Sequence, residues 1–194
     1  MTARGLTIAI LGLVVLCTAS AGADDDVYAE IRELIEGCDG CHGENGASDN
    51  PEFPILAGQH FYYLYVQLKD FKAARRADET MEANVAELNK GQMRLLAQFY
   101  SEQSWPNIGF KADPERAARG RTATDAGQCV ACHLGDFIGD SRIPRVAGQH
   151  PAYLEKTMLD FKTKTRANSP AIATLLATFS DDDIAAMAEY MGGM

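Results

Sequence analysis

Two short stretches decide the fold: CDGCH at residues 38–42 and CVACH at residues 129–133. Both have the pattern Cys-x-x-Cys-His, and their first cysteines lie 91 positions apart. The residues that follow also recur, because PILAGQH at 54–60 is echoed by PRVAGQH at 144–150, an offset of 90. The sequence is therefore an internal duplication of a unit of about 85 residues, which is small for an independent hydrophobic core.

Apolar residues in each unit recur three or four positions apart, which is the spacing of one face of a helix. The first unit shows this pattern at 27–38, 61–71 and 93–100, and the second unit repeats the last two segments at 151–161 and 184–191. Neither unit contains a convincing alternation of apolar and polar residues, the pattern of a half-buried strand. We therefore predict an all-α protein made of two tandem helical domains, each a small helical bundle.

The domain boundaries follow from the duplication and from turn-forming residues. We expect the first domain at 24–104, a linker rich in Pro and Gly at 105–112, and the second domain at 113–194. Asp113 followed by proline is typical of a helix N-terminus, so the second domain begins with a helix.

Residues 1–23 have the pattern of a cleavable signal peptide. A positive charge at Arg4 precedes an apolar run at 6–17, and small residues follow at 19–23. A retained membrane anchor is the alternative, but the run is shorter than the roughly 20 residues that a spanning helix needs. Lipidation of Cys17 is disfavoured by the bulky leucine before it. We predict export to a bacterial periplasm.

Composition narrows the class of protein. Hydrophobic residues make up 46% and charged residues 23%, which indicates a globular chain rather than a disordered one. Acidic residues number 27 against 18 basic ones, and the net charge of −9 argues against a nucleic-acid partner. The chain has five cysteines, of which Cys17 lies in the leader and the other four in the two Cys-x-x-Cys-His stretches. No thiol is left for a structural disulfide.

The Cys-x-x-Cys-His pattern is the attachment signature of c-type haem. The thiols form thioethers with the haem vinyl groups, and the adjacent imidazole binds the iron as proximal ligand. The predicted anchors are Cys38, Cys41, Cys129 and Cys132, and the predicted iron ligands are His42 and His133. A thioredoxin-like dithiol would require strands alternating with helices, and a four-cysteine zinc site does not require a histidine after each pair.

The motif CxxCHGxxG, then P-x-(L/V)-A-G-Q-H-x-x-Y-L and D-F-K, resembles the diheme cytochrome c4 family over nearly the whole mature chain. Residues 70–88 also resemble the diheme subunit of flavocytochrome c sulfide dehydrogenase. The resemblance implies two class I cytochrome c domains, two covalently bound haem c groups and a periplasmic carrier of single electrons, not an enzyme. It also implies that Pro54 and Pro144 offer backbone carbonyls to the proximal imidazoles, although a simple turn is the alternative for each proline.

The same resemblance implies redox protein partners, such as a terminal oxidase, a quinol–cytochrome c reductase or a flavin dehydrogenase. Some family members associate peripherally with the membrane. The alternative function is that of the cytochrome subunit of a flavocytochrome-type dehydrogenase.

Family members complete the iron coordination with a Met thioether from a loop before the last helix. In the first unit this is Met81, seven residues before Leu88 and among polar neighbours. Met93 is the rival, but it lies on an apolar helical face and is expected in the core.

The second unit departs from this pattern, because the position 91 residues after Met81 is Ile172 and the segment 165–183 contains no Met. His150 is the remaining nitrogen candidate, but it repeats His60 and is expected to be structural. We therefore predict a second haem that is five-coordinate, water-bound or ligated by an unusual group, and that is able to bind carbon monoxide, nitric oxide or peroxide.

Three further polar pairs recur at an offset of 90. We expect these side chains to bond haem propionates, to connect helices or to lie on the surface. They are Gln59 and Gln149, Tyr63 and Tyr153, and Arg76 and Arg166.

Overall fold

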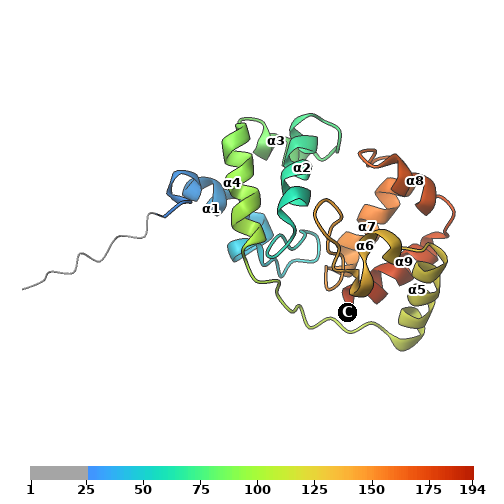
Figure 1. The fold of residues 1–194 in the computed structure, drawn as a ribbon. Coiled ribbons are helices and arrows are strands. Elements are labelled where there is room, and N and C mark those ends of the chain that lie inside the picture. Colours follow the sequence, from blue (N-terminus) through green and yellow to red (C-terminus); the bar gives the residue numbers. More distant parts are fainter. Residues whose placement is uncertain (1–25) are drawn as a thin grey trace, which may run out of the picture.

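The computed structural model describes residues 26–194 (Figure 1). The predicted signal peptide, residues 1–23 with Cys17, lies outside the described residues. The first half contains the short 3-10 helix η1 (Ala29–Ile31), α1 (Arg32–His42), η2 (Glu44–Gly46), α2 (Phe61–Lys72), α3 (Glu79–Val85) and α4 (Lys90–Ser101). The second half contains α5 (Pro114–Ala126), α6 (Val130–His133), η3 (Gly135–Phe137), α7 (Pro151–Lys162), α8 (Pro170–Leu176) and α9 (Asp181–Gly192).

The part of the chain that the structure describes contains helices and two isolated β-bridges but no strand, which confirms the all-α prediction. Figure 1 shows the two halves side by side, joined by an extended segment between α4 and α5. The predicted linker, 105–112, lies within that segment. No helix among residues 26–194 is both long and apolar enough to cross a bilayer.

The internal duplication is visible in the helix boundaries. α7 begins 90 residues after α2, and both helices have 12 residues. α8 begins 91 residues after α3, and α9 begins 91 residues after α4. The two halves are therefore built from the same arrangement of helices after the Cys-x-x-Cys-His stretch.

Side-chain caps fix where these helices begin. Asp78 caps α3, and its carboxylate accepts a hydrogen bond from the Met81 backbone N–H at 2.9 Å. Ser180 and Asp183 form a reciprocal capping box at the start of α9. Asn89 and Gln92 form the corresponding capping box at the start of α4.

Each half has its own apolar core. The first contains Ile35 of α1 and Leu96 of α4, with Met93 buried beside them as expected. The second contains Met187 of α9, packed with Leu154 of α7. Two separate cores support a two-domain reading, since burying apolar side chains is the main favourable term in folding.

The helices before the two histidines differ. In the first half, α1 runs without interruption through the motif to His42. In the second half, α5 ends at Ala126, Gln128 takes a positive φ of 50°, and α6 starts again at Val130. The break makes the second motif a separate short helix.

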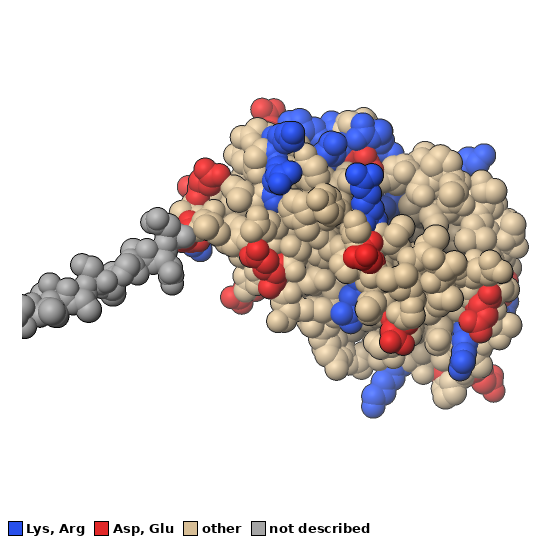
Figure 2. Space-filling model, viewed as in Figure 1, with Lys and Arg blue, Asp and Glu red and all other residues tan. Residues whose placement is uncertain are grey.

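Basic side chains are unevenly distributed over this acidic chain. Figure 2 shows blue side chains gathered where α2 and α4 meet the short α3. The sequence of α2 and the turn after it contributes Lys69, Lys72 and Arg75.

Candidate haem-binding sites

The thiols of each motif are free and lie one helical turn apart. Cys38 is partly buried and Cys41 is exposed, and the second half repeats this with Cys129 and Cys132. Residues three positions apart on a helix share a face. In each pair, therefore, one partly buried cysteine and one exposed cysteine lie on the same helical face.

The adjacent imidazoles are held in matching ways. His42 Nδ1 donates to the Pro54 carbonyl at 3.0 Å, and His133 Nδ1 donates to the Pro144 carbonyl at 2.9 Å. The carbonyl contacts implied by the family resemblance are thus present in both halves. With Nδ1 occupied, Nε2 is the nitrogen left for a metal, and the carbonyl fixes the ring orientation.

Burial sets the protonation of these groups. It lowers the pKa of His42 and of His133 below the usual value, despite the opposing hydrogen bonds to the prolines. Burial also raises the pKa of the Cys38 and Cys129 thiols. Neutral imidazoles can bind iron, whereas protonated thiols are poor candidates for a reactive dithiol.

The donor set fits covalently attached haem better than the alternatives. Each half offers two free thiols and one neutral imidazole with its second nitrogen anchored. No group of three or more His, Cys, Asp or Glu that could hold a metal ion by itself occurs among residues 26–194. This argues against a four-cysteine zinc site, which would bring both pairs together.

Met81 and Ile172 occupy equivalent positions. Each is the third residue of its short helix, α3 or α8. Met81 is partly buried and packs against the first core. The sequence predicted a loop here, whereas the structure has a helix of seven residues, because Asp78 caps the first turn.

The two repeated glutamines, Gln59 and Gln149, hold the halves together in a reciprocal manner. Gln149 accepts from the Ile55 N–H and donates to the Ile55 carbonyl, both at 3.0 Å. Gln59 accepts from the Arg145 N–H at 3.0 Å and donates to its carbonyl at 2.9 Å. Since position 145 corresponds to position 55, each amide completes the backbone of the opposite half.

The histidines that follow the glutamines repeat this exchange. His60 Nε2 lies 2.8 Å from the Ile138 carbonyl, and His150 Nε2 lies 2.9 Å from the Ser48 carbonyl. Both are structural, as the sequence predicted. His150 is 5% exposed, so its bond lies inside the interface.

The repeated arginines and tyrosines also meet across the interface. Arg76 donates to the Tyr153 hydroxyl at 2.9 Å, and Arg166 donates to Gln67 at 2.8 Å. An isolated antiparallel bridge joins Arg76 to Arg166. Burial opposes ionisation of Tyr153, but the two guanidinium groups prevail and lower its pKa to about 8.

The sequence singled out these polar pairs and included the connection of helices among their expected roles, but it did not show that they would connect one half to the other. Their recurrence at one offset was the available signal. The missing information was that a duplicated residue can contact the other copy of the unit rather than its own.

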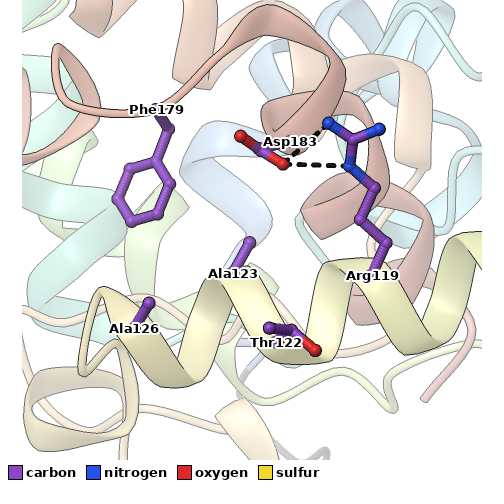
Figure 3. A pocket seen from close by; sticks show the side chains of 6 residues that line it. All are labelled: Arg119, Thr122, Ala123, Ala126, Phe179 and Asp183. Atoms are coloured by element: carbon purple, nitrogen blue, oxygen red, sulfur yellow. Dashed lines mark hydrogen bonds and ion pairs between the residues drawn. The ribbon is translucent and has the colours of Figure 1, made fainter.

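A surface cavity of about 390 Å³ lies between α5 and α9 (Figure 3). Phe179 and Ala126 line one side of it, and Arg119 and Asp183 form an ion pair on the other. None of the motif cysteines or histidines lines it. It is therefore separate from the candidate haem ligands.

The comparisons with known proteins agree with this geometry. Residues 115–191 match the family described as "Cytochrome C oxidase, cbb3-type, subunit III". The chain is 36% identical over 169 residues to cytochrome c4 of Thiocapsa roseopersicina, covering 81% of this chain and 86% of that one. It is 27% identical over 200 residues to a protein of Stutzerimonas stutzeri named thiosulfate dehydrogenase electron acceptor, covering 95% of this chain and 92% of that one.

The fold is also similar to a solved structure, that of reduced recombinant cytochrome c4 from Pseudomonas stutzeri. The TM-score is 0.77 at 30% sequence identity, and the match covers 84% of this chain and 95% of that one. The similarity thus includes both halves and the way they are joined.

Proposed function

The chain belongs to the cytochrome c4 family of diheme electron carriers, and from that membership we propose that it carries single electrons between redox proteins of the periplasm. It is a c-type cytochrome with two covalently bound haem c groups, and it transfers electrons without transforming a substrate. The periplasmic location is supported by the export pattern of residues 1–23.

The proposed attachment points are the four motif cysteines, and the proposed proximal ligands are His42 and His133. The observation that carries this assignment is the pair of imidazoles anchored through Nδ1 to Pro54 and Pro144. In the first half we propose Met81 as the distal ligand, because it lies in a capped helix beside the core. Bound haem supplies a one-electron iron couple whose potential depends on these ligands.

Side chains at the contact between the halves hold the two proposed haem sites in a fixed arrangement. Gln59 and Gln149 tie each half to the backbone of the other, and both side chains are 3% exposed. A carrier with two one-electron sites benefits from such rigidity, because a fixed arrangement avoids structural rearrangement when charge moves.

The proposed partners are redox proteins of a respiratory or sulfur-oxidising chain: a terminal oxidase, a quinol–cytochrome c reductase or a dehydrogenase. The similarity to a thiosulfate dehydrogenase electron acceptor favours a dehydrogenase as donor. The same similarity keeps a second candidate, the cytochrome subunit of a dehydrogenase complex. Co-purification of a stoichiometric flavin or catalytic subunit would favour that candidate.

The test is haem content and electron uptake of the full chain isolated from a periplasmic extract. We expect two covalent haems per polypeptide and uptake of two electrons in a reductive titration. Replacement of Cys38 and Cys41 by alanine is expected to halve both numbers. Fewer than two haems in the unaltered chain would contradict the proposed function.

A further inference from the structure

The short helices α3 and α8 are equivalent in length and position, but they differ in their third residue. Met81 is third in α3, and Ile172 is third in α8. A thioether sulfur has lone pairs that can bind iron, whereas the side chain of isoleucine is a hydrocarbon. At this helix position the second half offers no ligand atom.

Of the other methionines of the second half, Met194 is 45% exposed and the remaining three pack in or against the core. Met187 is 1% exposed and Met191 is 5% exposed, and both belong to the second core. Met158 of α7 packs against the same core. Its counterpart in the first half is Leu68, which also packs in a core and has no ligand atom. Met187 and Met191 fill space that the core requires, and Met158 stands where the first half has a leucine that cannot bind iron.

Three nitrogen side chains of the second half are engaged in other contacts. His150 Nε2 is bonded to the Ser48 carbonyl of the first half. Lys162 Nζ donates to the Phe179 carbonyl at 2.7 Å and to Asp181 at 2.6 Å. Lys156 Nζ is paired with Asp160 at 2.6 Å. Freeing His150 or Lys162 would break hydrogen bonds to backbone carbonyls, whereas the exposed Lys156–Asp160 pair contributes little to stability.

The two helices also differ in charge. α3 carries Glu79 and Glu82 in its first turn, whereas α8 carries no charged residue in its first or last turn. The residues on either side of Ile172 are Ala171 and Ala173, whose side chains are single methyl groups. A helix without charged side chains suits a small uncharged molecule better than an anion.

We propose that the haem of the second half has an open distal position and binds a small uncharged diatomic ligand of the carbon monoxide or nitric oxide type. The proposal rests on the haem attachment proposed above. It assigns to Ile172 the role of a specificity-determining residue, since the hydrocarbon leaves free a position that a thioether would close.

The experiment uses the full chain with both haems, reduced and titrated with carbon monoxide while the visible spectrum is recorded. We expect one carbon monoxide per two haems in the unaltered protein. Ile172→Met is expected to lower the affinity at least a hundredfold, and Met81→Ile is expected to raise the stoichiometry to two. Ile172→Leu is the matched control, because it changes the side chain without adding a sulfur and should keep one bound molecule.

The haem content of each preparation distinguishes a failure of the open-site proposal from a failure of the proposed function. Two covalent haems with no carbon monoxide uptake would overturn the open site and leave the electron-carrier function intact. Unchanged binding in Ile172→Met, with both haems present, would also overturn it. Should Ile172→Met not accumulate with both haems, Met81→Ile is the deciding variant. If Met81→Ile does not bind a second carbon monoxide, the proposal is contradicted.

Discussion

The two halves agree at the proposed proximal ligand and differ at the proposed distal one. His42 and His133 have the same carbonyl partner at the corresponding proline, at distances within 0.1 Å of each other. At the other position, Met81 has a thioether sulfur that can bind iron, whereas Ile172 has a hydrocarbon side chain of similar size. Duplication has kept the residues that build and orient the sites, while the residue expected to set reactivity differs.

A second difference concerns the helix that precedes the motif. α5 has 13 residues and packs closely on α9 at Gly120, where an added Cβ would lie 2.1 Å from the Ala186 carbonyl oxygen. The corresponding position of the first half is Ala29, in the short helix η1. The second half therefore has a close helix crossing at a glycine, whereas the first half packs η1 and α1 on α4 through larger side chains such as Tyr28 and Tyr100.

The largest effect is expected from removing the thiols of one half. Replacing Cys129 and Cys132 by alanine should leave one covalent haem per chain and a second half without its bound group. Because a unit of this size has a small core, we expect it to lose most of its helical signal. Mass spectrometry counts the haems, and circular dichroism reports the helices. The matched change of Cys38 and Cys41 should affect the first half instead, and two haems in either variant would contradict the assignment.

A substitution at the helix crossing should be next in size. Gly120→Ala forces α5 away from α9, and we expect the free energy of unfolding of the second half to fall by about 3 kcal/mol. Urea unfolding followed by circular dichroism measures it. Gly37→Ala is the control, because Gly37 is exposed on α1 and nothing lies within 4 Å of an added Cβ. This change should raise the free energy of unfolding by about 0.5–1 kcal/mol. Equal effects of both changes would show that the crossing is not tight.

The interface between the halves should give the smallest effects. Gln149→Ala leaves the N–H and carbonyl of Ile55 without partners, and Ile55 is 1% exposed, so we expect a loss of about 2 kcal/mol. Gln59→Ala should cost only about 1 kcal/mol, because its hydrogen bonds to Arg145 are only partly buried. Urea unfolding measures both, with exposed Gln98→Ala as a control. A larger loss for Gln59→Ala than for Gln149→Ala would mean that burial does not determine the strength of these hydrogen bonds.

Much of this could be predicted from sequence because the signals are local. The motifs at 38–42 and 129–133 fix the thiols and imidazoles within five residues each. Helical spacing of apolar residues predicts the core faces, and Met93 and Met187 are buried accordingly. The capping box at Ser180 is likewise a pattern of neighbouring residues.

What the sequence left undetermined depends on distant contacts. Gln149 bonds a backbone 94 positions away, and no local pattern shows which half an amide will meet. The helix around Met81 was also missed, because its polar residues at 79–85 give no apolar stripe and its start depends on a cap. The break in the second motif rests on the positive φ of Gln128, a residue without a preference for that conformation.

The measurement that tests the difference between the halves most directly is electron paramagnetic resonance of the fully oxidised protein containing both haems. We predict two ferric signals of equal weight, one low-spin from a haem with His42 and Met81 as ligands and one high-spin from a haem without a strong distal ligand. Replacing Ile172 by methionine should convert the high-spin signal to low-spin. Two low-spin signals in the unaltered protein would contradict an open second site.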